Sequence, residues 1–185
     1  MNRFLKRFSM FDLVIIALTS ALGIAIKPII VPLVHIITGP LYIPGGAAAG
    51  GFYMLWIVLG IGITKKKGTG TLIGLIQALL VIISGVYGTH GAISIITYSI
   101  PGVITDIAAT LLKDKAFTPT GFFILGFTAN ITGTLLSSLV FFRLPLIPML
   151  LTLSVASLSG GLGGLIASRI MKELNKTNII NHIDK

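Results

Sequence analysis

Long apolar runs separated by short basic blocks dominate this chain of 185 residues. Most runs approach the roughly 20 residues that a helix needs to cross the hydrocarbon core of a membrane. Only 10% of the residues are charged and the mean hydropathy is +1.00, whereas soluble domains carry about 25% charged residues. So few charges cannot cover a water-soluble globule. The pattern therefore predicts an all-α integral membrane protein.

The charged blocks divide the chain into six predicted transmembrane helices. The first is short and continues into residues 28–37, where Pro28 and Pro32 are expected to produce a kink or a re-entrant segment. Its basic start also fits a cleaved signal peptide, but the later spans favour a retained helix. We expect a single transmembrane domain over residues 1–171 and a polar cytoplasmic tail over residues 172–185. The predicted spans are Phe11–Ile26, Ile43–Ile63, Thr69–Val86, Ala92–Leu112, Thr120–Phe142 and Leu146–Ile170.

The positions of lysine and arginine set the predicted orientation. With the N-terminus in the cytoplasm, only Lys27 and Arg143 of the 14 basic residues lie outside. Cytoplasmic loops of membrane proteins are enriched in these residues, so both termini are predicted to be cytoplasmic. No basic stripe lies beside interleaved aromatic residues, which argues against a nucleic-acid partner.

The residues that catalysis requires are sparse. The chain has no cysteine, three histidines and five acidic residues, and it contains neither an HExxH motif nor a P-loop. Acidic residues scattered singly cannot form a paired-carboxylate or metal–diphosphate site. We therefore predict no catalytic residues, no metal site and no cofactor, and a transport component rather than an enzyme.

Small residues recur at helical spacing in several runs. Ala17, Ala21 and Ala25 share one face of the first helix, where they allow another helix to approach closely. Spacing alone leaves two interpretations, namely packing within the chain's own bundle or docking of another protein. Residues 45–51 consist only of glycine and alanine, which fits tight helix packing and a binding cavity equally well.

Aromatic and polar residues at the predicted outer ends of the helices are candidates for a ligand pocket. Rings can stack on a small, flat, polar ligand while cations and hydroxyl groups orient it. An interfacial aromatic belt and a snorkelling arginine are the alternatives. Within the spans, polar side chains are costly and tend to face the bundle interior or a cavity. The candidates are His35, Tyr42, Tyr87, His90 and Arg143 at the ends, and Tyr53, Gln77, Tyr98 and Asn130 within spans.

Asp106 is the only acidic residue well inside a predicted span. A proton-coupled carrier would use such a carboxylate. An acid near a helix end also caps a helix or pairs locally, and the sequence leaves both roles open.

The small size, the basic blocks, six predicted helices and the Ala17, Ala21, Ala25 face resemble the S components of energy-coupling factor (ECF) vitamin transporters. Gly39-Pro40, residues 50–53 and residues 65–68 further resemble the subgroup that takes up thiamine or its hydroxymethylpyrimidine precursor. The acidic residues expected in the third helix of that subgroup are replaced here, where Gly74 and Val81 stand.

This resemblance implies an S-component-like bundle in the prokaryotic plasma (inner) membrane that binds a small vitamin in its outer half. The alanine face would dock a transmembrane coupling (T) protein that carries a pair of cytoplasmic ATPases. The start Met1-Asn2-Arg3 differs from the Met-His-Ile metal site of cobalt and nickel relatives, so a metal substrate is not expected. A stand-alone secondary carrier or a small channel-forming protein is the alternative function.

Overall fold

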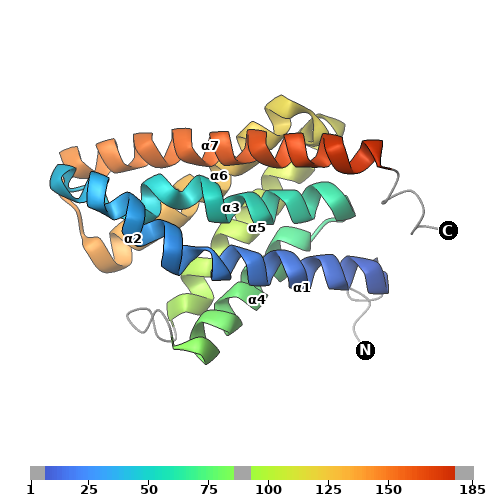
Figure 1. Cartoon of the computed structure of the whole chain (residues 1–185), viewed down its shortest axis with the longest axis horizontal. Coiled ribbons are helices and arrows are strands. Elements are labelled where there is room, and N and C mark those ends of the chain that lie inside the picture. The colour runs from blue at the N-terminus through green and yellow to red at the C-terminus, as the bar shows by residue number, and fades with distance from the viewer. Residues whose placement is uncertain (1–6, 86–92, 178–185) are drawn as a thin grey trace.

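The computed structural model describes residues 7–85 and 93–177, and these residues form a bundle of α-helices. Short 3₁₀ segments, η2 (Gly39–Leu41) and η4 (Lys113–Phe117), and a π-helical segment, η5 (Ser138–Phe142), extend or link the helices (Figure 1). The helices are α1 (Met10–Ala25), α2 (Lys27–Thr38), α3 (Gly45–Thr64), α4 (Thr69–Ser84), α5 (Ser94–Leu112), α6 (Pro119–Ser137) and α7 (Leu146–Lys176).

The helices confirm the all-α prediction, and each predicted span corresponds to one of them within a few residues. Among the described residues, five helical segments are long and apolar enough to cross a membrane, while α4 is shorter, with 16 residues. The count of six membrane crossings therefore stays a prediction, as do the cytoplasmic termini. Helix α7 continues to Lys176, so the first residues of the predicted polar tail are helical.

Residues 28–37 form a regular helix, α2, that follows α1 after a break at Ile26. Pro28 stands in the first turn of α2, where its missing N–H group would have no helical partner. Pro32 lies inside the helix. Together α1, α2 and η2 make one apolar segment of 32 residues, which fits the predicted kink better than a re-entrant segment.

Side-chain caps fix where the helices begin at one end of the bundle. Ser9 and Asp12 form a reciprocal capping box at the start of α1, and Asp12 also forms an ion pair with Lys66 in the turn between α3 and α4. Thr118 caps α6 by accepting a hydrogen bond from the Gly121 N–H group at 3.1 Å. The pair of Asp12 and Lys66 holds the basic turn after α3 against the first helix.

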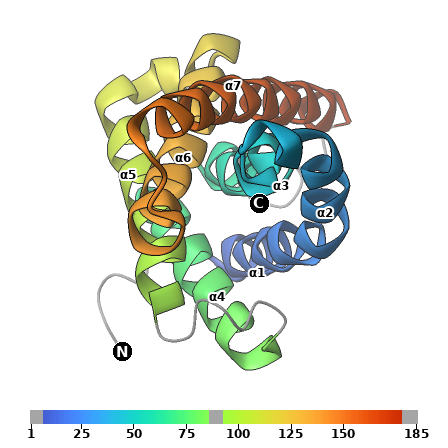
Figure 2. The ribbon, with the colours of Figure 1, turned by 90° about the vertical axis from the view of Figure 1, so that its left-hand side faces the viewer.

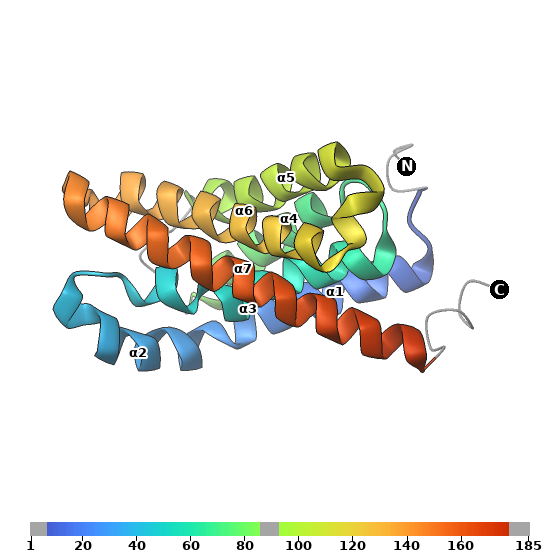
Figure 3. The ribbon, with the colours of Figure 1, turned by 90° about the horizontal axis from the view of Figure 1, so that it is seen from above.

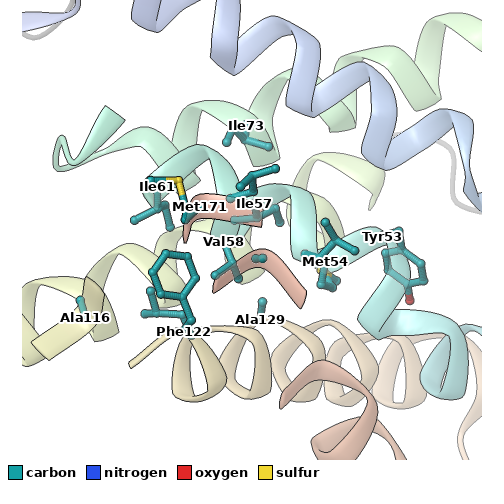
Figure 4. Packing of buried hydrophobic residues seen from close by; sticks show 14 of the residues in the cluster. Tyr53, Met54, Ile57, Val58, Ile61, Ile73, Ala116, Phe122, Ala129 and Met171 are labelled. Carbon is teal, nitrogen blue, oxygen red and sulfur yellow. The ribbon is translucent and has the colours of Figure 1, made fainter. Parts of the chain in front are cut away.

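Helix α3 is the central element of the bundle, and it packs against α1, α2, α4, α6 and α7 (Figure 2). Most of its residues are buried, including Ile57, Val58 and Ile61. These residues form an apolar cluster with Phe122 of α6 and Met171 of α7, and Tyr53 lies at one edge of that cluster (Figure 4). The apolar core is therefore built around α3.

Glycines bring α7 unusually close to α3 and α6. A Cβ atom on Gly160 would overlap the carbonyl of Gly126, and a Cβ atom on Gly163 would overlap the carbonyl of Gly51. Backbone-to-backbone packing of this kind is how small residues stabilise helix pairs in lipid. Ser159 strengthens the contact, because its hydroxyl group donates to the Ala48 carbonyl oxygen at 2.5 Å.

The start of α1 and the end of α7 lie at the same end of the bundle (Figure 1, Figure 3). The segments η2 and η5 lie at the opposite end, where α2 turns into α3 and α6 turns into α7. This arrangement gives the molecule two distinct ends, and the second carries the cavity described next.

Candidate functional site

A cavity of about 520 Å³ opens at the end of the bundle that carries η2 and η5. Its wall combines α2, the α2–α3 turn, the first half of α3, parts of α4, α5 and α6, and η5. Met54 and Ile57 separate it from the apolar core. A volume of this size is typical of small-molecule sites, which are commonly 300–1,000 Å³.

Among the described lining residues, Lys27 is the only lysine or arginine, and it lies beside two aromatic rings. Lys27, the first residue of α2, places its Nζ atom 4.2 Å from the centroid of the Tyr53 ring and 4.1 Å from that of the Tyr98 ring. The electron-rich faces of both rings thus attract the ammonium group. The Tyr53 hydroxyl group donates to the Gly46 carbonyl oxygen at 2.6 Å, which holds this ring in place.

Neutral polar groups complete the lining. Gln77 of α4 is 4% exposed and makes no hydrogen bond with any described residue. Ser138 in η5 is 2% exposed, and its buried hydroxyl group has no partner among the described residues. Both reach the cavity, as does His35, whose Nδ1 atom accepts a hydrogen bond from the Gly45 N–H group at 3.3 Å. The cavity therefore holds polar groups that a ligand can satisfy.

The structure brings five of the predicted site residues together at this cavity, and they are His35, Tyr42, Tyr53, Gln77 and Tyr98. Tyr87 and His90 lie outside the described residues. Arg143 is exposed beside η5 and does not contribute to the lining.

Asn130 is buried between three helices rather than at the cavity surface. Its Nδ2 atom donates to the Ala47 carbonyl oxygen of α3 at 3.0 Å and to the Ala156 carbonyl oxygen of α7 at 2.8 Å. The side chain is 0% exposed. Its observed role is to join α3, α6 and α7, because a mid-helix amide in an apolar bundle needs such partners.

Sequence reasoning missed several lining residues. Lys27 is the most informative, and its signal was an isolated cation apart from the cytoplasmic basic blocks at the end of an apolar run. The others carry short hydroxyl groups that are too common in membrane helices to single out; they are Thr97, Thr134, Ser137 and Ser138.

The three alanines of α1 are all exposed and share the outer face of the bundle. Other small residues behave differently, because Gly70 packs on Gly102 and Gly160 packs on Gly126 inside the molecule. The alanine face is therefore the small-residue pattern that the chain's own described helices leave uncovered.

Asp106 caps a helix from a neighbouring one. Its carboxylate accepts hydrogen bonds from the Gly70 N–H group at 3.0 Å, from the Thr71 N–H group at 2.7 Å and from the Thr71 hydroxyl group at 2.7 Å. These are N–H groups of the first turn of α4 that no helical carbonyl satisfies. These contacts match the helix-capping role that the sequence left open, and Asp106 does not line the cavity.

Residues 11–132 match the sequence family described as the permease component of an ABC-type cobalt transport system, and this chain belongs to that family. No curated protein sequence matches the chain. The fold is similar to the crystal structure of an S-component of an ECF transporter, with a TM-score of 0.73 and 16% sequence identity. The alignment covers 95% of this chain and 89% of the solved one.

The comparisons confirm the resemblance to the S components of ECF transporters at the level of fold. Family and fold together make the chain a multi-pass membrane component of a transport system. The ligand, the coupling partners and the orientation in the membrane stay predictions.

Proposed function

We propose that this chain is the substrate-binding membrane subunit of an ATP-driven ECF-type importer and that it captures a small vitamin or vitamin precursor in its cavity. The observation that carries the proposal is a cavity of about 520 Å³ with polar lining at one end of an S-component-like bundle. Thiamine and hydroxymethylpyrimidine are the compounds that the sequence resemblance suggests. The basic blocks support an orientation in which both termini are cytoplasmic and the cavity lies in the outer half.

The cavity favours an organic ligand over a metal ion, although the family description names cobalt. Metal sites gather several His, Cys, Asp or Glu side chains, and no group of three such residues forms a candidate metal site within residues 7–85 and 93–177. The ammonium group of Lys27 lies in the cavity wall, where it would repel a metal cation. The volume also exceeds by far what a single ion occupies.

Delivery of the ligand would use the exposed alanine face of α1. Ala17, Ala21 and Ala25 present a smooth, exposed strip on which a helix of the T protein can pack. The T protein would connect this subunit to a pair of cytoplasmic ATPases, since the chain has no P-loop of its own.

A bulky residue on the alanine face tests this proposal. In the source cells, Ala21→Trp is expected to abolish co-purification of the T protein and the ATPases with a tagged chain. Thermal stabilisation of the purified variant by a small-molecule extract of those cells should equal that of the wild type. Leu158→Trp is the matched control, because Leu158 is 65% exposed on α7, away from the strip.

The alternative function is a stand-alone secondary carrier. It predicts that uptake survives Ala21→Trp and persists when no ATPase partner is expressed. Either result would refute the S-component proposal, whereas loss of partners from Ala21→Trp alone supports it.

A further inference from the structure

Within the part of the chain that the structure describes, Lys27 has no acidic partner. No carboxylate lies within 4.0 Å of its Nζ atom among the described residues, and no acidic residue lines the cavity. The residue is at most about one third exposed in a chain whose surroundings are largely apolar. A charge at such a site is costly unless a group of opposite sign compensates it.

The rings of Tyr53 and Tyr98 provide only part of that compensation. A cation beside an aromatic ring gains about 0.5–2 kcal/mol, which is less than the several kcal/mol that removing a charge from water costs. Both rings are also neutral, so the net charge of the described lining stays positive. The described lining thus offers the Lys27 ammonium group no partner of opposite charge.

A second positive contribution comes from the start of α3. Gly45, Gly46 and Ala47 belong to the first turn of that helix, and all three line the cavity. The N-terminus of a helix carries a partial positive charge from its aligned peptide dipoles. The N-terminus of α3 and the ammonium group of Lys27 would therefore both attract a negatively charged ligand.

We infer that the ligand carries one negative charge, in the form of a carboxylate that pairs with the Lys27 ammonium group. This inference rests on the proposed function and narrows its substrate class to small organic acids. One lysine balances one negative charge, whereas a phosphate ester carries about 1.5 to 2 at neutral pH. The uncharged body of the ligand packs on Tyr53, Tyr98 and Met54, and Gln77 and Ser138 supply hydrogen bonds.

The inferred charge separates this chain from transporters of cationic vitamins. Thiamine carries a positive ring, which Lys27 would repel across a cavity of this size. Hydroxymethylpyrimidine is neutral and would leave Lys27 unpaired. An organic acid is the class that satisfies the site.

The test separates the charge of the ligand from its identity. A small-molecule extract of the source cells is passed over a strong anion-exchange resin at neutral pH, and the flow-through and the salt-eluted fraction are each added to the purified protein. The thermal unfolding midpoint reports binding. We expect stabilisation by the eluted fraction and none by the flow-through. Mass spectrometry of the molecules released on unfolding should then identify a carboxylic acid.

Variants of Lys27 connect the charge to the residue. Lys27→Met should weaken binding of the identified acid by about 10- to 100-fold, since a tenfold change corresponds to about 1.4 kcal/mol. Lys27→Arg keeps the charge and should retain most of the affinity. Lys65→Met is the control, because Lys65 also lies near an aromatic ring, 5.7 Å from the Phe117 centroid, but outside the cavity.

Each outcome has a defined meaning. Stabilisation by the flow-through, or by thiamine added alone, overturns the inference while the proposed function stands. An acid that binds Lys27→Met as tightly as the wild type also overturns it. Stabilisation by neither fraction contradicts the proposed function itself.

Discussion

Replacement of Gly50 by alanine tests the packing that holds the cavity wall together. A Cβ atom at this position would lie less than 3.0 Å from the Cγ, Oδ1 and Nδ2 atoms of Asn130. Asn130 is fully buried and cannot move away without losing its hydrogen bonds to the Ala47 and Ala156 carbonyl oxygens. The substitution therefore forces overpacking and also displaces the amide from the two contacts that join three helices.

The magnitude follows from these two costs. Overpacking a buried site costs about 1–3 kcal/mol, and each lost hydrogen bond costs about 0.5–1.5 kcal/mol. The higher helix propensity of alanine stabilises the folded state by about 1 kcal/mol, which offsets part of these costs. We expect Gly50→Ala to lower the free energy of unfolding by about 1–5 kcal/mol, which corresponds to a fall of about 3–15 °C in Tm for a chain of this length.

Gly46→Ala is the matched control one turn earlier in α3. The nearest neighbour of its added Cβ atom would be the Tyr53 hydroxyl group at 3.7 Å, an ordinary van der Waals distance. The control should be as stable as the wild type or slightly more stable because of the propensity gain alone.

The assay is thermal unfolding of the purified protein in one detergent, followed by the fluorescence of the single tryptophan, Trp56. Trp56 lies on α3 together with both glycines, so its signal reports on the same helix. A Gly50→Ala variant within about 2 °C of the wild type, or a Gly46→Ala variant that falls equally far, would refute the packing argument.

Two further substitutions separate structural roles from functional ones. Asp106→Asn weakens the cap of α4 and should lower the free energy of unfolding by about 1–2 kcal/mol. Uptake per folded molecule and the pH dependence of uptake should not change. Loss of uptake in well-folded protein would instead support proton coupling. Tyr53→Phe removes the hydrogen bond to Gly46 but keeps the ring beside Lys27. Tm should therefore fall by a few degrees. The affinity for the cavity ligand, measured by calorimetry, should stay within about threefold of the wild type. A large loss of affinity in Tyr53→Phe would assign the hydroxyl group to the ligand.

The helices were predictable because lipid imposes a strict requirement on length and polarity. Basic residues mark where the apolar runs stop, so the limits of α3 and α5 follow almost directly from Lys65 and Lys113. The cap formed by Asp106 illustrates the limit of this reasoning. Its partners on α4 lie 35 and 36 residues earlier in the chain, and no local pattern connects them.

The cavity was predictable only in part. Tyr53 and Tyr98 stand out as polar aromatic residues within apolar runs, but their approach to Lys27 depends on how α2, α3 and α5 pack. The same rule that singled out these tyrosines also singled out Asn130, because a buried amide is unusual whether it binds a ligand or two backbone carbonyls. Sequence identifies residues that need partners, and the packing determines which partner each one has.

The contact between α7 and α3 has a consequence for how such a protein diversifies. Where Gly163 approaches the Gly51 carbonyl, no side chain can be enlarged without separating the two helices. Helix α2 forms part of the cavity wall and has no fully buried residue, so substitutions at its cavity-lining positions disturb the core less. On the proposed function, exchanges at cavity residues of α2 such as Lys27 and His35 would change which ligand is bound, while the close contact of Gly163 with Gly51 would keep the packing of α7 on α3 unchanged.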